Sequence, residues 1–280
     1  MNRRIALVTC EQFPTLSDDD RLLQQALGAR GLSGTPVVWT EPSPDWSAFD
    51  LAMIRSTWDY HRRFPDFQRW IDETAPRVPL WNPPTLLRWN MRKTYLRDLA
   101  GNGVPTVPTE WGAAPTDLAR AAASHQWRRV VVKPSVSANA ERTHLLDSPD
   151  AISALALDDR GTDGWMVQPY LDEVEGRGER SLVFLGGEYS HAAQRKAALN
   201  PTVPLVDGTA VTATAGERET AGRALAAVRD PWLYARVDLV TTRDGVARVM
   251  ELEMIEPFLY LRAAPGAAAR LAELVERRIS

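Results

Sequence analysis

Hydrophobic and polar positions over the first 85 residues follow the pattern of a parallel α/β unit. Short apolar runs typical of buried strands flank one stretch with helical spacing, which begins behind a Ser-Asp-Asp-Asp cluster suited to an N-cap. The predicted order is strand, helix, strand and strand, at residues 4–9, 17–27, 36–39 and 49–54. This order favours a parallel sheet with crossover helices. Ligands bind such sheets beyond the carboxyl ends of the strands.

Two loops of this unit, residues 9–20 and 55–61, are therefore expected to face a substrate. Their polar residues supply the substrate candidates, which are Asp19, Arg55, Ser56, Thr57 and Asp59. Arg55 and Asp59 stand at a strand end, where packing explains a charged residue poorly. Trp58 and Tyr60 are instead interpreted as packing residues.

The rest of the apolar pattern predicts a mixture of helices and strands. The stretch from Leu80 to Pro84 interrupts the helical pattern that precedes it and is interpreted as a domain junction. Helices are predicted at residues 64–75, 89–99 (capped by Asn90), 117–124, 151–157, 217–228 and 267–278. Strands are predicted at residues 129–134 and 165–171, and residues 179–185 and 189–196 are predicted to pair as a hairpin over Gly186-Gly187.

A second predicted hairpin, near the C-terminus, gathers charged residues on one face. Two β-rich runs, residues 234–240 and 246–255, flank Asp244-Gly245, a dipeptide that suits a two-residue turn. In that register Asp238 faces Glu251 and Arg236 faces Glu253. Side chains alternate along strands, so all four charges share one face.

The same register assigns the apolar residues of this hairpin to two faces. Val240 and Val249 are predicted beside the charges, whereas Leu239 and Met250 are predicted on the core face. A solvated face is polar along its length, and this one is not. The charges are therefore expected to lie within an apolar frame.

Three carboxylates in such a frame conflict, because opposed like charges destabilise a sheet and a desolvated carboxylate costs more still. A hard divalent cation removes the conflict, and Mg²⁺ prefers carboxylate and phosphate oxygens. The alternative is an ordinary charged face on which Arg236 pairs with one acid. We predict a magnesium site formed by Asp238, Glu251 and Glu253.

Composition narrows the setting of this site. The chain has 280 residues and a net charge of −3, which gives no indication of a nucleic-acid or anionic-membrane partner. The apolar run after Arg4 is too short for a signal peptide, and no stretch could span a bilayer. Cys10 is the only cysteine, which excludes an internal disulfide. We expect a cytoplasmic protein, and a homodimer is compatible with the sequence.

Several cations are placed in or beside apolar elements, namely Lys93, Lys133, Lys196 and Arg236. Mg²⁺ together with such groups is the usual equipment for phosphoryl transfer, in which positioning and charge neutralisation supply most of the catalysis. The chain has no Walker motif and no protein-kinase motif set, and its glycines are too scattered for a dinucleotide loop.

The ordered motifs resemble those of the ATP-grasp superfamily of carboxylate–amine ligases. They are Lys93, Val-Val-Lys133-Pro, Val167-Gln168-Pro169-Tyr170-Leu171, Gly178-Glu179, Arg236-Val-Asp238 and Glu251-Leu-Glu253. The resemblance implies an α/β fold in which a half-Rossmann N-terminal domain (residues 1–85) precedes an ATP-grasp domain (86–280). The latter comprises a lid at about 105–167 and a catalytic subdomain at about 168–280.

The resemblance also implies roles for these residues. Lys93 and Lys133 hold the ATP phosphates, and Glu179 contacts the ribose. The hinge residues Gln168, Pro169, Tyr170 and Leu171 bond the adenine edge. Asp238, Glu251 and Glu253 bind Mg²⁺. Arg236 stabilises an oxyanion while an amine attacks an acyl phosphate, and Lys196 or Arg195 reaches the γ-phosphate.

Three further stretches, at residues 54–60, 88–96 and 189–191, are similar to one subgroup. It includes the cyclo-ligase that closes the isoxazolidinone ring of D-cycloserine from O-ureido-D-serine, which implies a small amino-acid-like substrate and antibiotic biosynthesis. The chain departs from the superfamily pattern at Glu253, where Asn is usual, and in the loop after Lys133, which has no glycine. The stretch 197–209 also lacks an arginine expected to grip a substrate carboxylate.

Two other functions fit the same residues. One is a small-molecule kinase that stops at phosphoryl transfer, and the other is a nucleotide-binding protein without catalysis. A metal or acid–base role for His61 and His191 is also considered, although a single histidine in a strand is more often packed and hydrogen-bonded.

Overall fold

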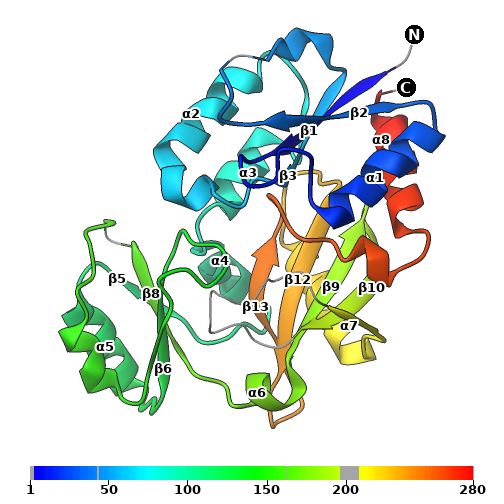
Figure 1. Cartoon of the computed structure of the whole chain (residues 1–280). Helices are drawn as coiled ribbons and strands as arrows, with labels where there is room; N and C mark the ends of the chain where they lie inside the picture. The colour runs from blue at the N-terminus through cyan, green and yellow to red at the C-terminus, as the bar shows by residue number, and fades with distance from the viewer. Residues whose placement is uncertain (1–2, 43, 162, 196–207, 280) are drawn as a thin grey trace.

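The computed structural model describes residues 3–279 apart from residues 43, 162 and 196–207, and it contains three sheets that follow one another along the chain (Figure 1). The first sheet is parallel, with strand order β2-β1-β3-β4. Its unit comprises β1 (Arg4–Thr9), α1 (Asp18–Ala29), β2 (Ser33–Val38), η1 (Trp46–Ala48), β3 (Leu51–Ser56), η2 (Tyr60–Arg63), α2 (Phe64–Thr74) and β4 (Leu80–Trp81). The predicted parallel unit is confirmed.

Helices cover both faces of this first sheet. Helix α2 packs its aromatic side on one face, and α1 packs Leu23 and Leu27 on the other. Ser17 caps α1 by accepting a hydrogen bond from the Asp20 N–H. Because parallel strands are buried on both faces, they appear in the sequence as continuous apolar runs.

The last helix of the chain, α8 (Ala267–Ile279), belongs to this same layer. It lies beside α1, and its Leu271 and Val275 share a core with Leu23 and Leu27 (Figure 1). The two ends of the chain consequently lie near each other. The core of the first sheet thus includes residues from the C-terminus, and the domain boundaries given above stay predictions.

The second sheet is antiparallel, with strand order β5-β8-β6-β7. Its elements are β5 (Glu110–Gly112), α5 (Pro115–Ser124), β6 (Val130–Pro134), β7 (His144–Leu146), η3 (Pro149–Ala154) and β8 (Trp165–Pro169). Helix α5 and η3 pack on one face through Leu118, Ala122 and Ile152.

The third sheet is antiparallel, with strand order β11-β10-β9-β12-β13. Its elements are α6 (Glu173–Arg177), β9 (Glu179–Leu185), β10 (Glu188–Arg195), β11 (Thr209–Val211), α7 (Ala215–Ala226), β12 (Tyr234–Thr241), β13 (Ala247–Glu253) and η4 (Leu261–Ala263). Helix α7 covers one face, and a capping box between Thr214 and Glu217 fixes its start. The opposite face is left for the site described below.

Two predicted helices were wrong in detail. The helix expected at residues 89–99 is broken into α3 (Pro84–Asn90) and α4 (Tyr95–Gly101). Asn90 does not cap a helix but bridges to β13, because its side chain bonds the Leu252 carbonyl and the Met254 N–H at 2.8 Å each. The helix expected at residues 151–157 is the short 3₁₀ element η3.

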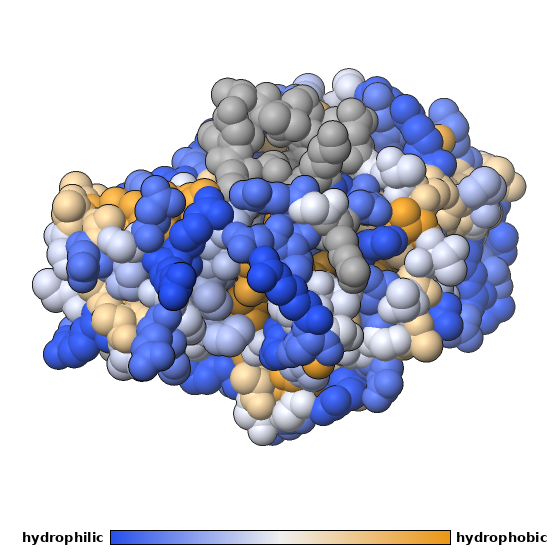
Figure 2. All heavy atoms as spheres, turned by 90° about the horizontal axis from the view of Figure 1, so that it is seen from below, coloured by the Kyte–Doolittle hydropathy of each residue, from blue (hydrophilic) through white to orange (hydrophobic). Residues whose placement is uncertain are grey.

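The face shown in Figure 2 is largely hydrophilic where its residues are coloured. Seen from below, hydrophilic residues dominate, and hydrophobic residues form separate small groups. Among the described residues, no helix combines the length and the apolar character needed to cross a bilayer.

Candidate functional site

A cavity of about 530 Å³ lies where the three sheets meet. Its wall is formed by β6 and β8 of the second sheet, by β13 of the third, and by loops of the first unit. Lys133, Gln168, Glu251 and Trp58 represent these four contributions. A cavity of this size is within the range of small-molecule and cofactor sites.

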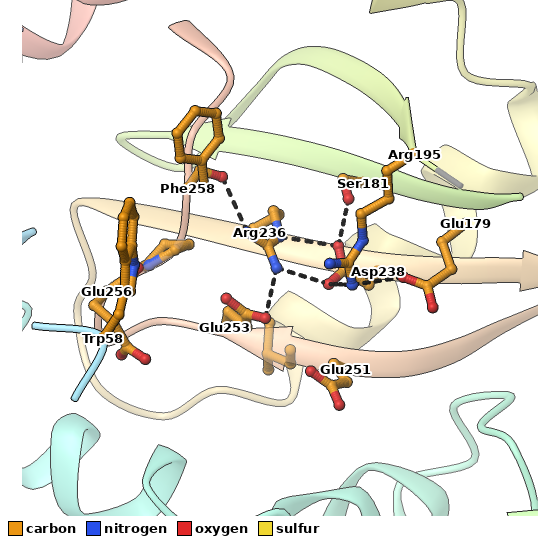
Figure 3. Close-up of polar contacts among 12 residues, drawn as sticks. Trp58, Glu179, Ser181, Arg195, Arg236, Asp238, Glu251, Glu253, Glu256 and Phe258 are labelled. Carbon is orange, nitrogen blue, oxygen red and sulfur yellow. Dashed lines mark hydrogen bonds and ion pairs between the residues drawn. The ribbon is translucent and has the colours of Figure 1, made fainter. Parts of the chain in front are cut away.

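The charged hairpin of β12 and β13 forms one side of the cavity. Arg236 pairs with Glu253 and Asp238 pairs with Glu251, which confirms the predicted register at the acids. Figure 3 shows these side chains gathered on one face of the third sheet, together with Glu179 and Arg195.

The predicted two-residue turn of this hairpin was wrong. Thr242 pairs with Val246 through a 3.0 Å backbone bond, so three residues form the loop, and Gly245 has a φ of +80°. A β-bulge at Asp238/Leu239 then shifts the register by one residue and restores the expected pairing at the acids.

The bulge also exchanges two apolar residues between the faces. Val249, predicted beside the charges, packs in the core under α7. Met250, predicted in the core, lines the cavity and packs near Val240. A one-residue shift moves a side chain to the other face of a sheet.

Arg236 is the most heavily bonded residue of the site. Its Nε and Nη2 each donate to Asp238 at 3.0 Å, Nη2 also contacts Glu253 at 2.5 Å, and Nη1 donates to the Phe258 carbonyl at 3.1 Å (Figure 3). Within the described chain these bonds occupy four of the five N–H groups of a guanidinium. One Nη1 hydrogen therefore remains for a ligand in the cavity that Arg236 lines.

Asp238 is fully buried and is held from several sides. Ser181 Oγ donates to it at 2.7 Å, and Arg195 Nη2 lies 3.5 Å from its other oxygen. Arg195 also pairs with Glu179 at 2.5 Å, which links β10 to β9 across the sheet. Asp238 is thus fixed before any ligand binds.

Glu251 faces two lysines. Lys133 Nζ lies 3.0 Å and Lys93 Nζ 3.7 Å from the same Glu251 oxygen. Burial alone raises the pKa of Glu251, but the two lysines outweigh it and hold the pKa well below its usual value. This carboxylate is ionised at neutral pH.

Glu253 has the opposite balance. Burial raises its pKa to about 7; Arg236 opposes the shift, and the charges of Asp238 and Glu251 add to it. The positive charge of Arg236 therefore does not balance the negative charges of the acid cluster. A further cation beside Glu253 would balance them.

The donor set of this cluster fits a magnesium ion. One oxygen from each of Asp238, Glu251 and Glu253 can be chosen so that all three lie within 4.8 Å of one another. Carboxylate oxygens are the ligands that Mg²⁺ prefers, usually with water and substrate phosphates completing the shell. The raised pKa of Glu253 reflects its burial and the repulsion from Asp238 and Glu251, and such an ion would relieve that repulsion.

All the nucleotide-binding residues predicted from the sequence line this one cavity. They are Lys93, Lys133, Gln168, Pro169, Tyr170, Leu171 and Glu179. The hinge backbone is held by a bond from the Tyr170 N–H to the Arg129 carbonyl at 2.8 Å. Contact with a nucleotide stays a prediction for each of these residues.

The glycine-free loop after Lys133 adopts conformations that glycine usually supplies. Asn139 and Ala140 have φ values of +54° and +55°, and both line the cavity. Lys93 Nζ donates to the Ser137 carbonyl at 2.9 Å, which joins this loop to the lysine pair. The loop therefore adopts left-handed backbone conformations in the cavity wall although it contains no glycine.

The predicted catalytic residues divide into two groups. Arg236 and Arg195 both line the cavity within the same ion-pair network. Lys196 lies outside the described residues. The catalytic roles of all three stay predictions.

None of the five predicted substrate residues is part of the cavity wall. Arg55 donates to Asp20 at 2.8 Å, Ser56 donates to the same carboxylate, and Asp59 accepts from Trp39 at 2.8 Å. Asp19 accepts from the Arg262 N–H at 3.2 Å, and Thr57 is fully buried. Substrate contact by these residues stays a prediction; the structure places them behind the wall.

The aromatic residues of the loop 55–61 lie in the cavity wall, where its charged residues were expected. Trp58 and Tyr60, interpreted from the sequence as packing residues, line the cavity. Glu256 also lines it and was missed, because it follows the end of β13, beyond the reach of strand alternation. Burial raises the pKa of Glu256 to about 8, and Glu253 adds to the shift.

The two histidines are hydrogen-bonded outside the cavity wall. His191 Nδ1 lies 2.9 Å from Ser190 Oγ, and its Nε2 lies 2.8 Å from the Leu259 carbonyl, to which it donates. His61 contacts Glu141 at 2.9 Å. Within the described chain, neither histidine contacts Asp238, Glu251 or Glu253.

Comparison with known proteins identifies the family. Residues 5–82 match the family described as "D-cycloserine synthetase DcsG, N-terminal domain". Over 98% of its length the chain is 32% identical to the cycloserine biosynthesis protein DcsG of Streptomyces lavendulae, 98% of which is covered. The chain belongs to the DcsG family.

Solved structures of DcsG-family and other ATP-grasp proteins show the same fold. The crystal structure of D-cycloserine synthetase DcsG matches with a TM-score of 0.88 at 30% identity, over 99% of this chain and 100% of that one. An ATP-grasp RimK domain protein from Sphaerobacter thermophilus matches with a TM-score of 0.72 at 20% identity, over 97% and 98%. D-alanine–D-alanine ligase from Bacillus anthracis matches with a TM-score of 0.66 at 17% identity, over 99% and 97%.

These matches confirm the predicted α/β ATP-grasp fold and the resemblance to the DcsG subgroup. This DcsG-family protein is an ATP-dependent ligase of the ATP-grasp type.

Proposed function

We propose that this protein uses Mg-ATP to convert the carboxylate of a small amino-acid-like substrate into an acyl phosphate, and then joins that carbon to an amine of the same molecule. The observation that carries the proposal is the arrangement of charge along one cavity wall. Two lysines lie at one end, three carboxylates in the middle, and Arg236 beside them with one unused N–H.

The two lysines are the proposed ligands of the ATP phosphates. Lys93 and Lys133 now share one oxygen of Glu251. When ATP occupies the cavity, the phosphates compete for both ammonium groups, and Glu251 becomes free to bind a metal. Asp238, Glu251 and Glu253 would hold Mg²⁺, which would supply neutralisation of the phosphate oxygens.

The first chemical step forms a bond between a carboxylate oxygen of the substrate and the γ-phosphorus of ATP, and ADP leaves. The second step forms a carbon–nitrogen bond: the amine attacks the carbonyl carbon, inorganic phosphate leaves with one former carboxylate oxygen, and the nitrogen loses a proton to solvent. Both steps place negative charge on oxygen near the cavity wall. Arg236 offers its remaining Nη1 hydrogen to that oxygen.

Ring closure within one molecule is supported by the family. One relative, which matches 98% of this chain, is named a cycloserine biosynthesis protein, and the protein of the most similar fold reported above is named D-cycloserine synthetase. An isoxazolidinone ring closes when an aminooxy nitrogen attacks the carbonyl carbon of the same amino acid. We therefore propose a substrate that carries both a carboxylate and an O-linked amine.

Product analysis tests this function. The protein is incubated with Mg-ATP and either O-amino-D-serine or O-ureido-D-serine, with D-serine as the matched compound that lacks the second nitrogen. We expect ADP, phosphate and D-cycloserine in equal amounts from O-amino-D-serine, and no ring from D-serine. O-ureido-D-serine is expected to give the same products together with carbon dioxide and ammonia, because its carbamoyl group must also be removed by water. Formation of AMP and pyrophosphate, or of a stable phosphorylated product, contradicts the proposal.

A further inference from the structure

The segment 256–259 follows β13 and is fixed at every carbonyl. Each of its four consecutive carbonyl oxygens accepts a hydrogen bond from a different side chain. In chain order the donors are Trp58 Nε1 (3.0 Å), Arg55 Nη2 (2.8 Å), Arg236 Nη1 (3.1 Å) and His191 Nε2 (2.8 Å). The donors come from the first unit and from the third sheet, so this segment joins the two and has little freedom to move.

The carboxylate of Glu256 stands at the head of this segment and faces the cavity. The residue is only 9% exposed, yet it lines the cavity. Apart from its own backbone N–H, the carboxylate has no hydrogen-bond or ion-pair partner among the described residues, and the charges of Lys93 and Arg236 act on it only from a greater distance. Figure 3 shows it beside Trp58, on the far side of Glu253 from Asp238.

Every other acid of this network has a cation. Lys93 and Lys133 face Glu251, Arg236 contacts Asp238 and Glu253, and Arg195 contacts Glu179; these contacts range from 2.5 to 3.7 Å. Glu256 forms no ion pair within the described chain. Burial makes its negative charge unfavourable and raises its pKa to about 8. A cation from outside the protein removes that cost.

The walls around Glu256 are aromatic. Phe13 and Trp58 meet edge to face with centroids 4.8 Å apart, and Phe258 lies 6.1 Å from Trp58. All three line the cavity. Aromatic faces attract ammonium groups, and the attraction strengthens when the cation is desolvated.

We propose that Glu256 and the aromatic side chains of Phe13, Trp58 and Phe258 form the subsite that binds the α-ammonium group of the substrate. The proposal rests on the proposed function for the substrate class, an amino-acid-like molecule. It adds the protein residues that would distinguish an α-amino acid from the corresponding carboxylic acid that lacks the α-amino group.

The fixed segment gives this subsite a positioning role. Glu256 holds the α-ammonium group, and two residues later the Phe258 carbonyl is bonded to Arg236. The anchor for the amine therefore lies on the segment to which the donor for the oxyanion is hydrogen-bonded.

Binding of two compounds that differ only in the α-amino group tests the subsite. O-amino-D-serine and 3-(aminooxy)propanoate are titrated calorimetrically into the wild-type protein with Mg²⁺ and AMP-PNP. The same titrations are made with Glu256→Gln, which keeps the shape and removes the charge. Glu110→Gln is the matched control, because Glu110 is a surface carboxylate paired with His125 at 2.8 Å, outside the cavity.

We expect the wild type and Glu110→Gln to bind O-amino-D-serine at least tenfold more tightly than 3-(aminooxy)propanoate. Glu256→Gln is expected to lose this preference, whereas its affinity for 3-(aminooxy)propanoate and for AMP-PNP stays within about twofold of wild type. Glu256→Asp, which keeps the charge, is expected to retain part of the preference. It serves as the second variant if the glutamine form is unstable.

Equal affinity of the wild type for the two compounds overturns the proposal, as does an equal loss of both in Glu256→Gln. A change confined to the Mg²⁺ dependence of AMP-PNP binding assigns Glu256 to the metal and also overturns it. Turnover is measured separately. If the wild type discriminates in binding but forms no ADP from either compound, the proposed reaction fails while the ammonium subsite stands.

Discussion

Replacing Arg236 by lysine tests the role of the guanidinium most sharply, because the charge is kept and the fork is lost. Arg236 makes four bonds, three of them to carboxylates. A single ammonium nitrogen cannot reach Asp238, Glu253 and the Phe258 carbonyl together. If two of the four bonds are lost, at about 1.5 kcal/mol or more each, the free energy of unfolding falls by about 3 kcal/mol.

The effect on catalysis is expected to be larger than stability alone can explain. Removing one donor to a developing oxyanion costs about 10²–10³ in kcat, or roughly 3–4 kcal/mol. Phosphate release is measured under saturating ATP and substrate, at a temperature where urea titration shows the variant folded. Arg248→Lys, which alters an arginine of the same hairpin that pairs with Asp244 at 2.9 Å outside the cavity, is the control and should keep wild-type kcat.

Two results refute this reasoning. A kcat within about threefold of wild type in folded Arg236→Lys shows that the guanidinium contributes no donor to the transition state. A rise in KM with kcat unchanged shows that Arg236 only binds the ground state of the substrate.

Three further changes have defined outcomes. Lys133→Met removes an ammonium group that lies 3.0 Å from Glu251, and we expect calorimetry to show AMP-PNP affinity lowered by about 10–100-fold; unchanged affinity contradicts the phosphate role. Burial raises the pKa of Asp19 from 3.8 to about 6, so the folded state holds an extra proton between these pH values and loses stability as pH rises through them. Asp19→Asn has no such proton to lose. Between pH 4 and pH 7 its free energy of unfolding, measured by denaturation, should therefore rise by up to about 3 kcal/mol relative to that of the wild type. A difference between the two proteins that is the same at both pH values refutes the burial effect. Gly178 has a φ of +69° and an added Cβ lies 2.5 Å from the Arg195 carbonyl oxygen, so Gly178→Ala should lower the free energy of unfolding by at least about 1–2 kcal/mol, and an unchanged melting temperature contradicts this.

The sequence was sufficient for the acid cluster because its pattern is local. Asp238, Glu251, Arg236 and Glu253 lie on two strands joined by a short loop, and alternation along strands brings them together. The turn was predicted wrongly, yet the pairing was right, since the bulge at Leu239 compensated a three-residue loop. A bulge of this kind leaves no trace in the apolar pattern. Because the bulge was not foreseen, two apolar residues, Val249 and Met250, were predicted on the wrong face of the sheet.

The first unit shows where the pattern is not sufficient. Arg55 was expected in the cavity because packing explains a charge at a strand end poorly, but its Nε and Nη2 are hydrogen-bonded inside the protein to Asp20 and the Pro257 carbonyl. Pro257 is 202 residues away, and no local pattern predicts that contact. Trp58 was interpreted as a packing residue; its ring does pack against Phe13 and Phe258, but it also lines the cavity.

Oxygen transfer from the substrate tests the proposed chemistry most directly. O-amino-D-serine labelled with ¹⁸O in both carboxylate oxygens is converted with unlabelled Mg-ATP, and the phosphate is examined by mass spectrometry. We expect one ¹⁸O in each phosphate released, because the acyl phosphate breaks at the carbon and phosphate leaves with a former carboxylate oxygen. Unlabelled phosphate formed together with D-cycloserine, or ¹⁸O recovered in AMP, contradicts activation of a carboxylate by phosphorylation in this cavity.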